Sequence, residues 1–377
     1  MTPARTITDP AAPKLLYIHM AALGDAVMAS PALRMLKQGL PGWRIAVLAR
    51  THTADYFRGL PWVDEVISFV NDRYVDRKRP WRLLGGWGEA VRLFQELKRG
   101  DYAAVIQWRG QLPDTLMSLC TGAPHRIATV QFIHRRAALP VEKLRFLVTD
   151  LVTVSRPEAH MVEAMAAPAD FLLRKLGGSV PANPDLSMDY PLQAADHAAA
   201  AEFLNAQGLA GEVPLACVGI SAKTAVNSWP LDRFAAVADH LGLQHGFRVV
   251  LTGIPAHRDR ERAIAASMKT EPVCSTGRLP FGVLCALLAR SRLLVSLNTG
   301  LSHIAAALRV PVVVLSGRDG ASITPWGTPH RVVTRNPFYP RRHPDRRQWA
   351  GLVPLITVDE VRESIDALMS EAYASQS

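Results

Sequence analysis

The sequence is poor in several features that mark particular classes of protein. Its few cysteines, Cys120, Cys217, Cys274 and Cys285, form no C-x-x-C pair, so we expect buried thiols rather than a disulfide framework or a zinc knuckle. No apolar run approaches the length of a membrane-spanning helix, and residues 1–13 lack the apolar stretch of a signal peptide. These absences predict a cytoplasmic protein.

Several ligand-binding motifs are absent as well. Neither G-x-G-x-x-G nor G-x-x-x-x-G-K-[ST] occurs, which weighs against a dehydrogenase or a P-loop NTPase. No zinc-finger spacing and no RNA-recognition signature are present, so nucleic acid is not an expected partner. We also find no paired acidic cluster suited to a metal ion, and we expect neither a metal nor another cofactor.

Positive charge, by contrast, is abundant. The formal net charge is +10, which favours a polyanionic partner. Two clusters mix basic with aromatic residues: 73–82, which contains Arg77, and 335–349, which contains Arg341 and Arg342. Both would suit phosphorylated glycolipid headgroups or the inner face of the cytoplasmic membrane, as a peripheral contact. A solvated charged loop is the alternative for each.

Strand-length apolar runs alternate with helical patterns in both halves of the chain. The predicted strands are 15–18, 44–48, 64–69 and 103–107, then 215–220, 247–251, 293–296 and 312–315. This alternation predicts an α/β protein with two Rossmann-like, doubly wound domains facing a cleft. We expect an N-terminal domain at 1–178, a Pro-rich linker at 179–192 and a C-terminal domain at 193–355. Residues 356–377 should end in a helix, for which packing back on the first domain is one arrangement.

The first strand-to-helix turn, residues 21–25, contains Gly24 and Asp25. In an open α/β sheet, ligands bind at the carboxyl ends of strands, where such turns lie. A carboxylate at this place can act as a base, although Asp25 can equally be a cap of the following helix. Arg109 follows the strand 103–107 in the same way.

In the second half, residues 296–303 join a strand directly to a helix. The first turn of that helix contains Thr299, Gly300, Ser302 and His303. Free N–H groups and the helix dipole favour a phosphate there, while a structural role is the alternative for His303.

A matching turn, residues 219–224, contains Ser221 and Lys223. Lys223 could place a positive charge on a diphosphate, and its alternative is an exposed loop lysine.

Four motifs together resemble glycosyltransferase family 9, the ADP-heptose:lipopolysaccharide heptosyltransferases. They are G-D-x-V-x-x-x-P-A-L-R from Gly24, x-S-W-P at 227–230, T-G-L-S-H-x-A-A-A-L from Thr299 and I-T-V-D-E-V at 356–361. The resemblance implies a GT-B fold and transfer of a heptose from an ADP-sugar to a lipopolysaccharide core, with inversion and no required metal. It puts Asp25 on the catalytic base, and Thr299, Gly300 and His303 on the donor diphosphate loop.

The chain departs from the family at three donor positions. Asn227 stands where the family has Lys, Asn298 where it has Asp, and His257 where it has a Glu that contacts the nucleoside. The predicted donor site therefore comprises Ser221, Lys223, Asn227, His257, Asn298, Thr299, Gly300, Ser302 and His303. The predicted acceptor site, for an anionic glycolipid, comprises Gly24, Arg77, Arg109, Arg341 and Arg342.

Two other functions stay open at this stage. A sugar-nucleotide epimerase can share the two-domain architecture, but it would need further acid/base residues at the sugar. A non-catalytic relative that binds nucleotide or glycolipid is suggested by the altered donor positions. Hydrolysis of ADP-, GDP- and UDP-sugars would separate the three.

Overall fold

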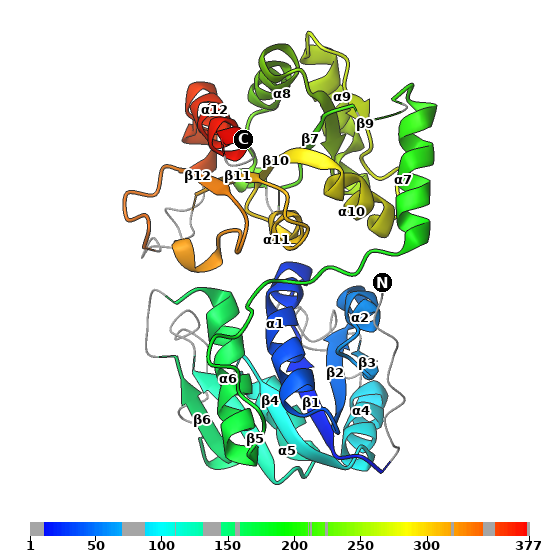
Figure 1. Cartoon of the computed structure of the whole chain (residues 1–377), viewed down its shortest axis with the longest axis vertical. Coiled ribbons are helices and arrows are strands. Elements are labelled where there is room, and N and C mark those ends of the chain that lie inside the picture. Colours follow the sequence, from blue (N-terminus) through cyan, green and yellow to red (C-terminus); the bar gives the residue numbers. More distant parts are fainter. Residues whose placement is uncertain are drawn as a thin grey trace. The chain divides into compact units, whose positions relative to one another are not determined.

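The structure is a computed structural model that describes residues 11–69, 87–109, 111–130, 145–154, 159–209, 211, 213–222, 225–317, 320–341 and 351–374 (Figure 1). Its internal contacts divide the chain into two compact units, Met1–Asp189 and Tyr190–Ser377, which we call unit 1 and unit 2. The division falls inside the segment 179–192, which contains three of the chain's prolines. Each unit is described by itself below.

Unit 1 contains a parallel six-stranded sheet in the order β3-β2-β1-β4-β5-β6. The strands are β1 (Lys14–His19), β2 (Arg44–Arg50), β3 (Glu65–Phe69), β4 (Tyr102–Gln107), β5 (His125–Val130) and β6 (Asp150–Thr153). The helices are α1 (Leu23–Gly39), α2 (Thr51–Gly59), α4 (Trp87–Arg99), α5 (Leu112–Cys120) and α6 (Met161–Leu176). Right-handed crossovers place α1 and α6 together on one face and α4 with α5 on the other.

Two of these strands, β5 and β6, were not predicted. β6 has four residues, none of them buried, and β5 begins with His and Arg. Neither therefore shows the continuous apolar run that marks a central parallel strand such as β1, whose Leu15, Leu16, Tyr17 and Ile18 are buried on both faces. Residues 131–144 lie outside the described part of the chain.

Helix α1 tolerates a proline in its interior because a neighbour compensates for the missing N–H. Pro31 cannot donate to the carbonyl of Val27 four residues earlier. The hydroxyl of Ser30 donates to that same Val27 carbonyl at 2.7 Å, so the buried oxygen keeps a partner. The Ser30 oxygen in turn accepts from the N–H of Asp189 at 2.9 Å, which attaches the end of unit 1 to this point of α1.

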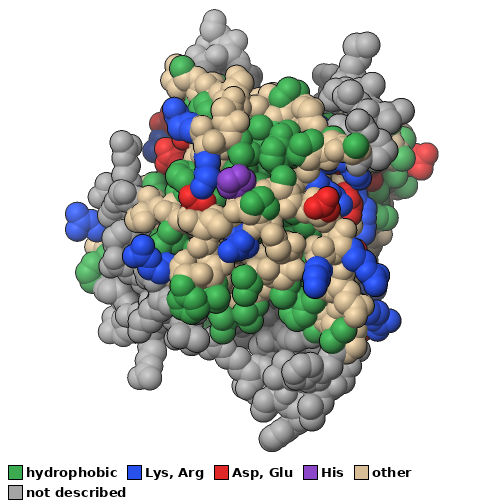
Figure 2. Space-filling view, turned by 90° about the horizontal axis from the view of Figure 1, so that it is seen from below, with side chains coloured by type: hydrophobic (Ala, Val, Ile, Leu, Met, Phe, Trp, Pro, Cys, Tyr) green, Lys and Arg blue, Asp and Glu red, His purple; other side chains and the backbone are tan. Residues whose placement is uncertain are grey.

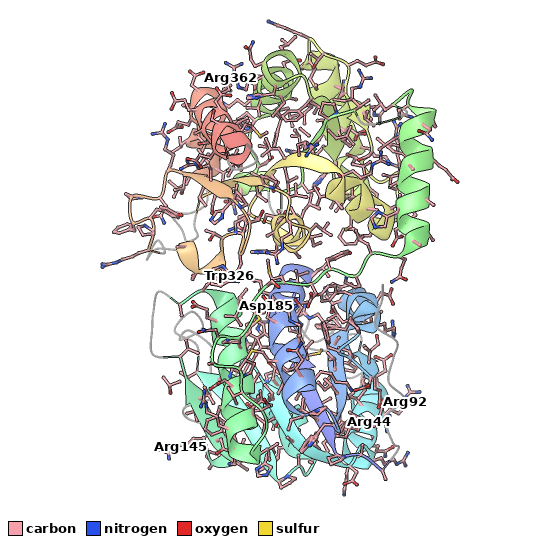
Figure 3. All side chains as sticks on the ribbon, viewed as in Figure 1. Arg44, Arg92, Arg145, Asp185, Trp326 and Arg362 are labelled. Atoms are coloured by element: carbon pink, nitrogen blue, oxygen red, sulfur yellow. The ribbon has the colours of Figure 1, made fainter. Side chains whose placement is uncertain are left out.

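The extended segment from Ser179 to Asp189 is held on unit 1 by Arg34 of α1. The Arg34 guanidinium donates to the Asp189 carboxylate at 2.7 Å and to the Asp185 and Ser187 carbonyls at 2.8 and 2.7 Å. Figure 3 shows Asp185 beside α1. The Arg34 side chain is only 8% exposed, so this network is a buried anchor rather than a surface ion pair.

Unit 2 repeats the architecture. Its parallel sheet has the order β12-β11-β10-β7-β8-β9. If β7 is counted as the first strand, this order is 6-5-4-1-2-3, which is the order of unit 1 read from the opposite edge of the sheet. The strands are β7 (Leu215–Gly219), β8 (Arg248–Thr252), β9 (Val273–Cys274), β10 (Ser291–Leu297), β11 (Val312–Ser316) and β12 (His330–Thr334). The α-helices are α7 (Ala194–Ala206), α8 (Leu231–His245), α9 (Arg258–Ser267), α10 (Phe281–Ala289), α11 (Gly300–Ala307) and α12 (Val358–Ala374).

The last helix, α12, belongs to the core of unit 2. Its buried residues Val361, Ile365, Leu368 and Met369 join the hydrophobic cluster of the sheet, and α12 contacts β11, β12 and α8. That this helix also packs back on the first domain stays a prediction. Among the described residues, no helix combines the length and the apolar character that crossing a bilayer requires.

Candidate active site

The predicted site residues of unit 1 lie at its topological switch point. β1 and β4 are adjacent parallel strands whose following helices, α1 and α5, cover opposite faces of the sheet. The loops after the two strands therefore diverge and leave a crevice at the carboxyl edge, which is where ligands bind in such sheets. Asp25 follows β1 and Arg109 follows β4, so the fold brings together two residues that are far apart in the sequence.

Asp25 lies in the first turn of α1. This helix begins at Leu23, inside the segment 21–25 that was expected to be the turn. Its Oδ2 accepts a hydrogen bond from the backbone N–H of Ala22 at 3.3 Å. This contact is the carboxylate half of a capping box. The helix-cap role considered as the alternative is thus present, and it leaves the carboxylate at the carboxyl edge of the sheet, partly exposed.

Arg109 is oriented towards the loop that precedes Asp25. Its Nη1 donates to the carbonyl of Met20 at 3.2 Å, and its guanidinium lies 5.6 Å from the centre of the Trp108 ring. The Trp108 ring stacks on His19 with centroids 5.5 Å apart. Burial, followed by the charge of Arg109, lowers the pKa of His19 to about 3, so this imidazole is neutral at physiological pH.

Asp114, in the first turn of α5, is a further candidate that the sequence did not reveal. Burial raises the pKa of its carboxyl to about 6, although the nearby charges of Arg109 and Arg50 act in the opposite direction. A buried acid with a strongly raised pKa at a ligand-binding edge is a typical functional group. No motif marks it, because its burial results from the packing of α5 against the sheet.

We expect Asp114→Asn to stabilise the protein in a pH-dependent way. An acid whose pKa is higher in the folded state contributes stability below its unfolded pKa of 3.8, and that contribution is lost as pH rises through about 6. The variant should therefore gain up to about 3 kcal/mol in unfolding free energy near pH 8 and almost nothing near pH 4. Urea unfolding at the two pH values measures this difference, with the exposed Glu202→Gln as control. A gain that is equal at both pH values would contradict it.

Unit 2 has its own switch point, between β7 and β10. The two strands pair with Gly219 opposite Ser296. A Cβ on Gly219 would meet the Ser296 Cβ at 2.9 Å, closer than real Cβ atoms come, so glycine is required for this approach. The turns that contain Ser221 and Asn298 therefore leave the sheet side by side.

The predicted phosphate-binding turn forms the N-terminus of α11. Thr299 is the N-cap residue and Gly300 begins the helix, so first-turn N–H groups and the positive end of the dipole lie at the carboxyl edge. Ser302 is buried, and its hydroxyl donates to the Thr299 carbonyl at 2.7 Å. His303 is only 6% exposed. Ser302 therefore shapes the turn, whereas Thr299 and Gly300 are the more accessible residues of this set.

Ser221 connects the turn after β7 to the turn after β8. Its hydroxyl lies 3.1 Å from His257 Nδ1 and accepts from the N–H of Ile254 at 3.1 Å. Burial and the charge of Arg260 lower the pKa of His257, so the ring is neutral at physiological pH. The hydroxyl of Ser221 engages Nδ1, which leaves Nε2 as the ring atom for a ligand.

The x-S-W-P motif divides into a structural part and an accessible part. Trp229 is buried and donates from Nε1 to the Ile356 carbonyl at 2.9 Å, which joins two of the recognised motifs. Asn227 ends the short 3-10 helix 225–227 and is partly buried. Next to it, Arg260 Nη2 donates to Ser228 Oγ at 2.5 Å, so α9 places a cation beside this loop. No motif in the sequence marked this cation.

Three predicted residues, Lys223, Arg77 and Arg342, lie outside the described part of the chain. Arg341 is described and exposed, beside the exposed rings of Phe338 and Tyr339. Gly24 is buried within α1, where it contributes backbone rather than surface. On the face shown in Figure 2, described Lys and Arg side chains are interspersed with acidic and hydrophobic ones, so that face is mixed in charge.

Two Rossmann-like units of the same strand order, each with candidate ligand groups at its switch point, define the GT-B class of enzymes. Comparison with known proteins gives the family. Residues 90–347 match the profile of glycosyltransferase family 9 (heptosyltransferase), and the chain belongs to this family of glycosyltransferases.

Among curated relatives, the chain is similar to lipopolysaccharide heptosyltransferase 1 of Pseudomonas aeruginosa, with 27% identity over 82% of this chain and 80% of that protein. Among solved structures, it is similar to the family 9 glycosyltransferase from Veillonella parvula, with a TM-score of 0.77, 20% identity and coverage of 95% and 98%. It also resembles E. coli heptosyltransferase WaaC with ADP, with a TM-score of 0.69, 20% identity and coverage of 94% and 99%.

Proposed function

We propose that this enzyme transfers a heptose from ADP-heptose to a lipopolysaccharide core or a related anionic glycan, with inversion at the anomeric carbon. The observation that carries the proposal is the location of the candidate groups. Asp25 lies at the switch point of unit 1, and the N-terminus of α11 lies at the switch point of unit 2. Membership of the heptosyltransferase family and the ADP in the structure of the E. coli relative support the choice of sugar and nucleotide.

In the proposed mechanism, Asp25 removes a proton from the acceptor hydroxyl as that oxygen attacks the anomeric carbon. Attack from the side opposite the diphosphate breaks the bond to the leaving group in one displacement, which inverts the configuration. The α11 N–H groups and His303 stabilise the charge that develops on the diphosphate. Arg109, anchored on the Met20 carbonyl, orients the acceptor next to Asp25.

The donor diphosphate needs a cation, because Asn227 replaces the usual lysine. Lys223, four residues earlier, supplies it from the same loop in our proposal, and Arg260 beside Ser228 is the second candidate. A hydrogen bond between charged groups contributes about 1.5–3 kcal/mol, so Lys223→Ala should weaken ADP binding by about ten- to a hundredfold. Calorimetric titration of ADP, GDP and UDP into the native protein, Lys223→Ala and Arg260→Ala measures this effect.

Each outcome of that titration has a separate meaning. Equal ADP affinity in the native protein and Lys223→Ala, with a loss in Arg260→Ala, would transfer the role to Arg260. Absence of nucleotide binding would favour a non-catalytic relative. His257 should also change the choice of nucleoside, because its single available nitrogen cannot accept two ribose hydroxyls as a carboxylate can.

The function itself is tested by incubating the enzyme with ADP-, GDP- and UDP-sugars, with and without a lipopolysaccharide core acceptor. Release of nucleoside diphosphate that depends on acceptor, with transfer of the sugar, supports the proposal. Conversion of the sugar nucleotide without acceptor would instead indicate an epimerase. In the same proposal, the exposed group Arg341, Phe338 and Tyr339 contributes to binding of the anionic acceptor or of the membrane that carries it.

A further inference from the structure

Two histidines and an aspartate converge on one point between helices α8 and α12 of unit 2. His240 Nε2 and His245 Nε2 each lie 2.7 Å from the same oxygen, Oδ1 of Asp366. The potential ligand atoms of the three residues all lie within 4.8 Å of one another. The two imidazoles are largely buried, with 13% and 19% of their side chains exposed, whereas Asp366 is half-exposed and open to solvent.

We propose that His240, His245 and Asp366 form a binding site for a divalent transition metal, with Zn²⁺ as the best-suited ion. Two imidazole nitrogens and one carboxylate oxygen are ligands that Zn²⁺ binds at about 2.0–2.2 Å, and they leave a coordination position for water. Ligand atoms at that distance from a tetrahedral ion stand about 3.3 Å apart, so small side-chain rotations convert the observed cluster into a site. On binding, the ion takes the place of the two hydrogen bonds to Asp366 Oδ1, and each Nε2 offers its lone pair to the ion.

The surroundings of the cluster favour a cation. His240 and Asp366 line a cavity of about 620 Å³ whose wall carries five carboxylates against one lysine and one arginine. Arg362, labelled on α12 in Figure 3, is that arginine, and its Nη1 lies 3.5 Å from Asp359. Asp239 accepts from the backbone N–H groups of Lys269 and Thr270. The cavity thus gives an ion access to Asp366, and the wall of the cavity is predominantly acidic.

The place of the cluster in the fold indicates a structural rather than a catalytic ion. Helix α8 starts after β7 at the carboxyl edge of the sheet and returns to the amino edge, where β8 begins at Arg248. His245 is the last residue of α8, so the cluster lies near the edge opposite the α11 turn. An ion there would connect α8 to α12, which lie side by side in unit 2 (Figure 1), and would hold the last helix on its sheet.

The test uses the full-length protein without an affinity tag, after removal of metals with a chelator. Zn²⁺ binding is measured by competition with a chromophoric chelator, and unfolding is followed by calorimetry. We expect one bound Zn²⁺ per chain, and a melting temperature raised by about 5 °C or more when free Zn²⁺ exceeds its dissociation constant about a hundredfold. Activity is not needed as a readout.

Single-residue variants distinguish Zn²⁺ binding at this site from Zn²⁺ binding by other side chains on the surface. His240→Ala, His245→Ala and Asp366→Asn should each weaken Zn²⁺ binding at least about tenfold, since even the loss of a group that only supports a ligand costs that much. Asp366→Asn keeps a hydrogen-bond acceptor for the imidazoles, so its fold should persist. The matched control is His197→Ala, which replaces an exposed histidine on α7. It should leave the Zn²⁺ affinity and the rise in melting temperature unchanged. No one-to-one binding in the native protein, or equal binding in the three site variants and the control, would overturn the proposal.

Discussion

Asp25→Asn is expected to lower the turnover number by about a hundredfold or more while leaving the fold and ADP binding nearly intact, because only the base is lost. The structure makes this substitution informative. Asp25 Oδ2 accepts from the Ala22 N–H, and an asparagine oxygen can accept the same hydrogen bond but cannot take a proton from the acceptor. The variant therefore removes the base and keeps the helix cap.

Asp25→Ala provides the comparison, because it removes both roles. It should show the same loss of turnover and, in addition, a loss of about 1 kcal/mol in unfolding free energy from the missing cap. Turnover is measured with donor and acceptor at saturation, ADP affinity by calorimetry and stability by urea unfolding. An Asn variant that turns over at the native rate would show that Asp25 is a cap and nothing more.

Arg34→Met should destabilise unit 1 by about 2–4 kcal/mol, somewhat less than the loss of a partner costs in a fully buried ion pair, because the Asp189 side chain left without its cation is 30% exposed. The arginine is 8% exposed and satisfies the Asp189 carboxylate together with two carbonyls of the segment 185–187. Methionine has a similar volume but no donors. Trp62 Nε1 also donates to Asp189 Oδ2 at 3.1 Å, so this carboxylate would keep one neutral donor.

The matched control is Arg58→Met, in the same unit. Arg58 pairs with Asp55 across a surface where the two side chains are 51% and 93% exposed. Such a pair contributes between about 0 and 1 kcal/mol. Thermal unfolding of both variants gives the comparison, and a similar small change in each would mean that the Arg34 network is no stronger than a surface pair.

Much of the fold follows from local patterns in the sequence. Central parallel strands are buried on both faces and therefore appear as continuous apolar runs, as in β1, β4, β7 and β11, and all four were predicted. The short edge elements β6, β9 and β12 were missed because they are partly exposed or have few residues. The motif order was sufficient to predict the family, which the profile match confirms.

The residue roles that were predicted from motifs stay predictions, and the structure adds residues that no motif contains. Asp114 became a candidate only because packing buries it near Arg109, and Arg260 only because α9 places it beside Ser228. His19 carries no motif signal either, since its strongly lowered pKa results from complete burial and the charge of an arginine 90 residues later. Arg34 is part of a recognised motif, but its partners at 185–189 lie about 150 residues away.

By itself, the sequence determined which turns follow which strands, because hydrophobic periodicity and helix-start residues are local properties of the chain. It placed Asp25 after a strand and Gly300 at the start of a helix. Only the tertiary structure decided that β1 lies beside β4 and β7 beside β10, which makes those turns neighbours of Arg109 and of Ser221. The physical reason is that the pairing of strands and the burial of charged groups depend on contacts between distant segments, and these exist only after the sheets have formed.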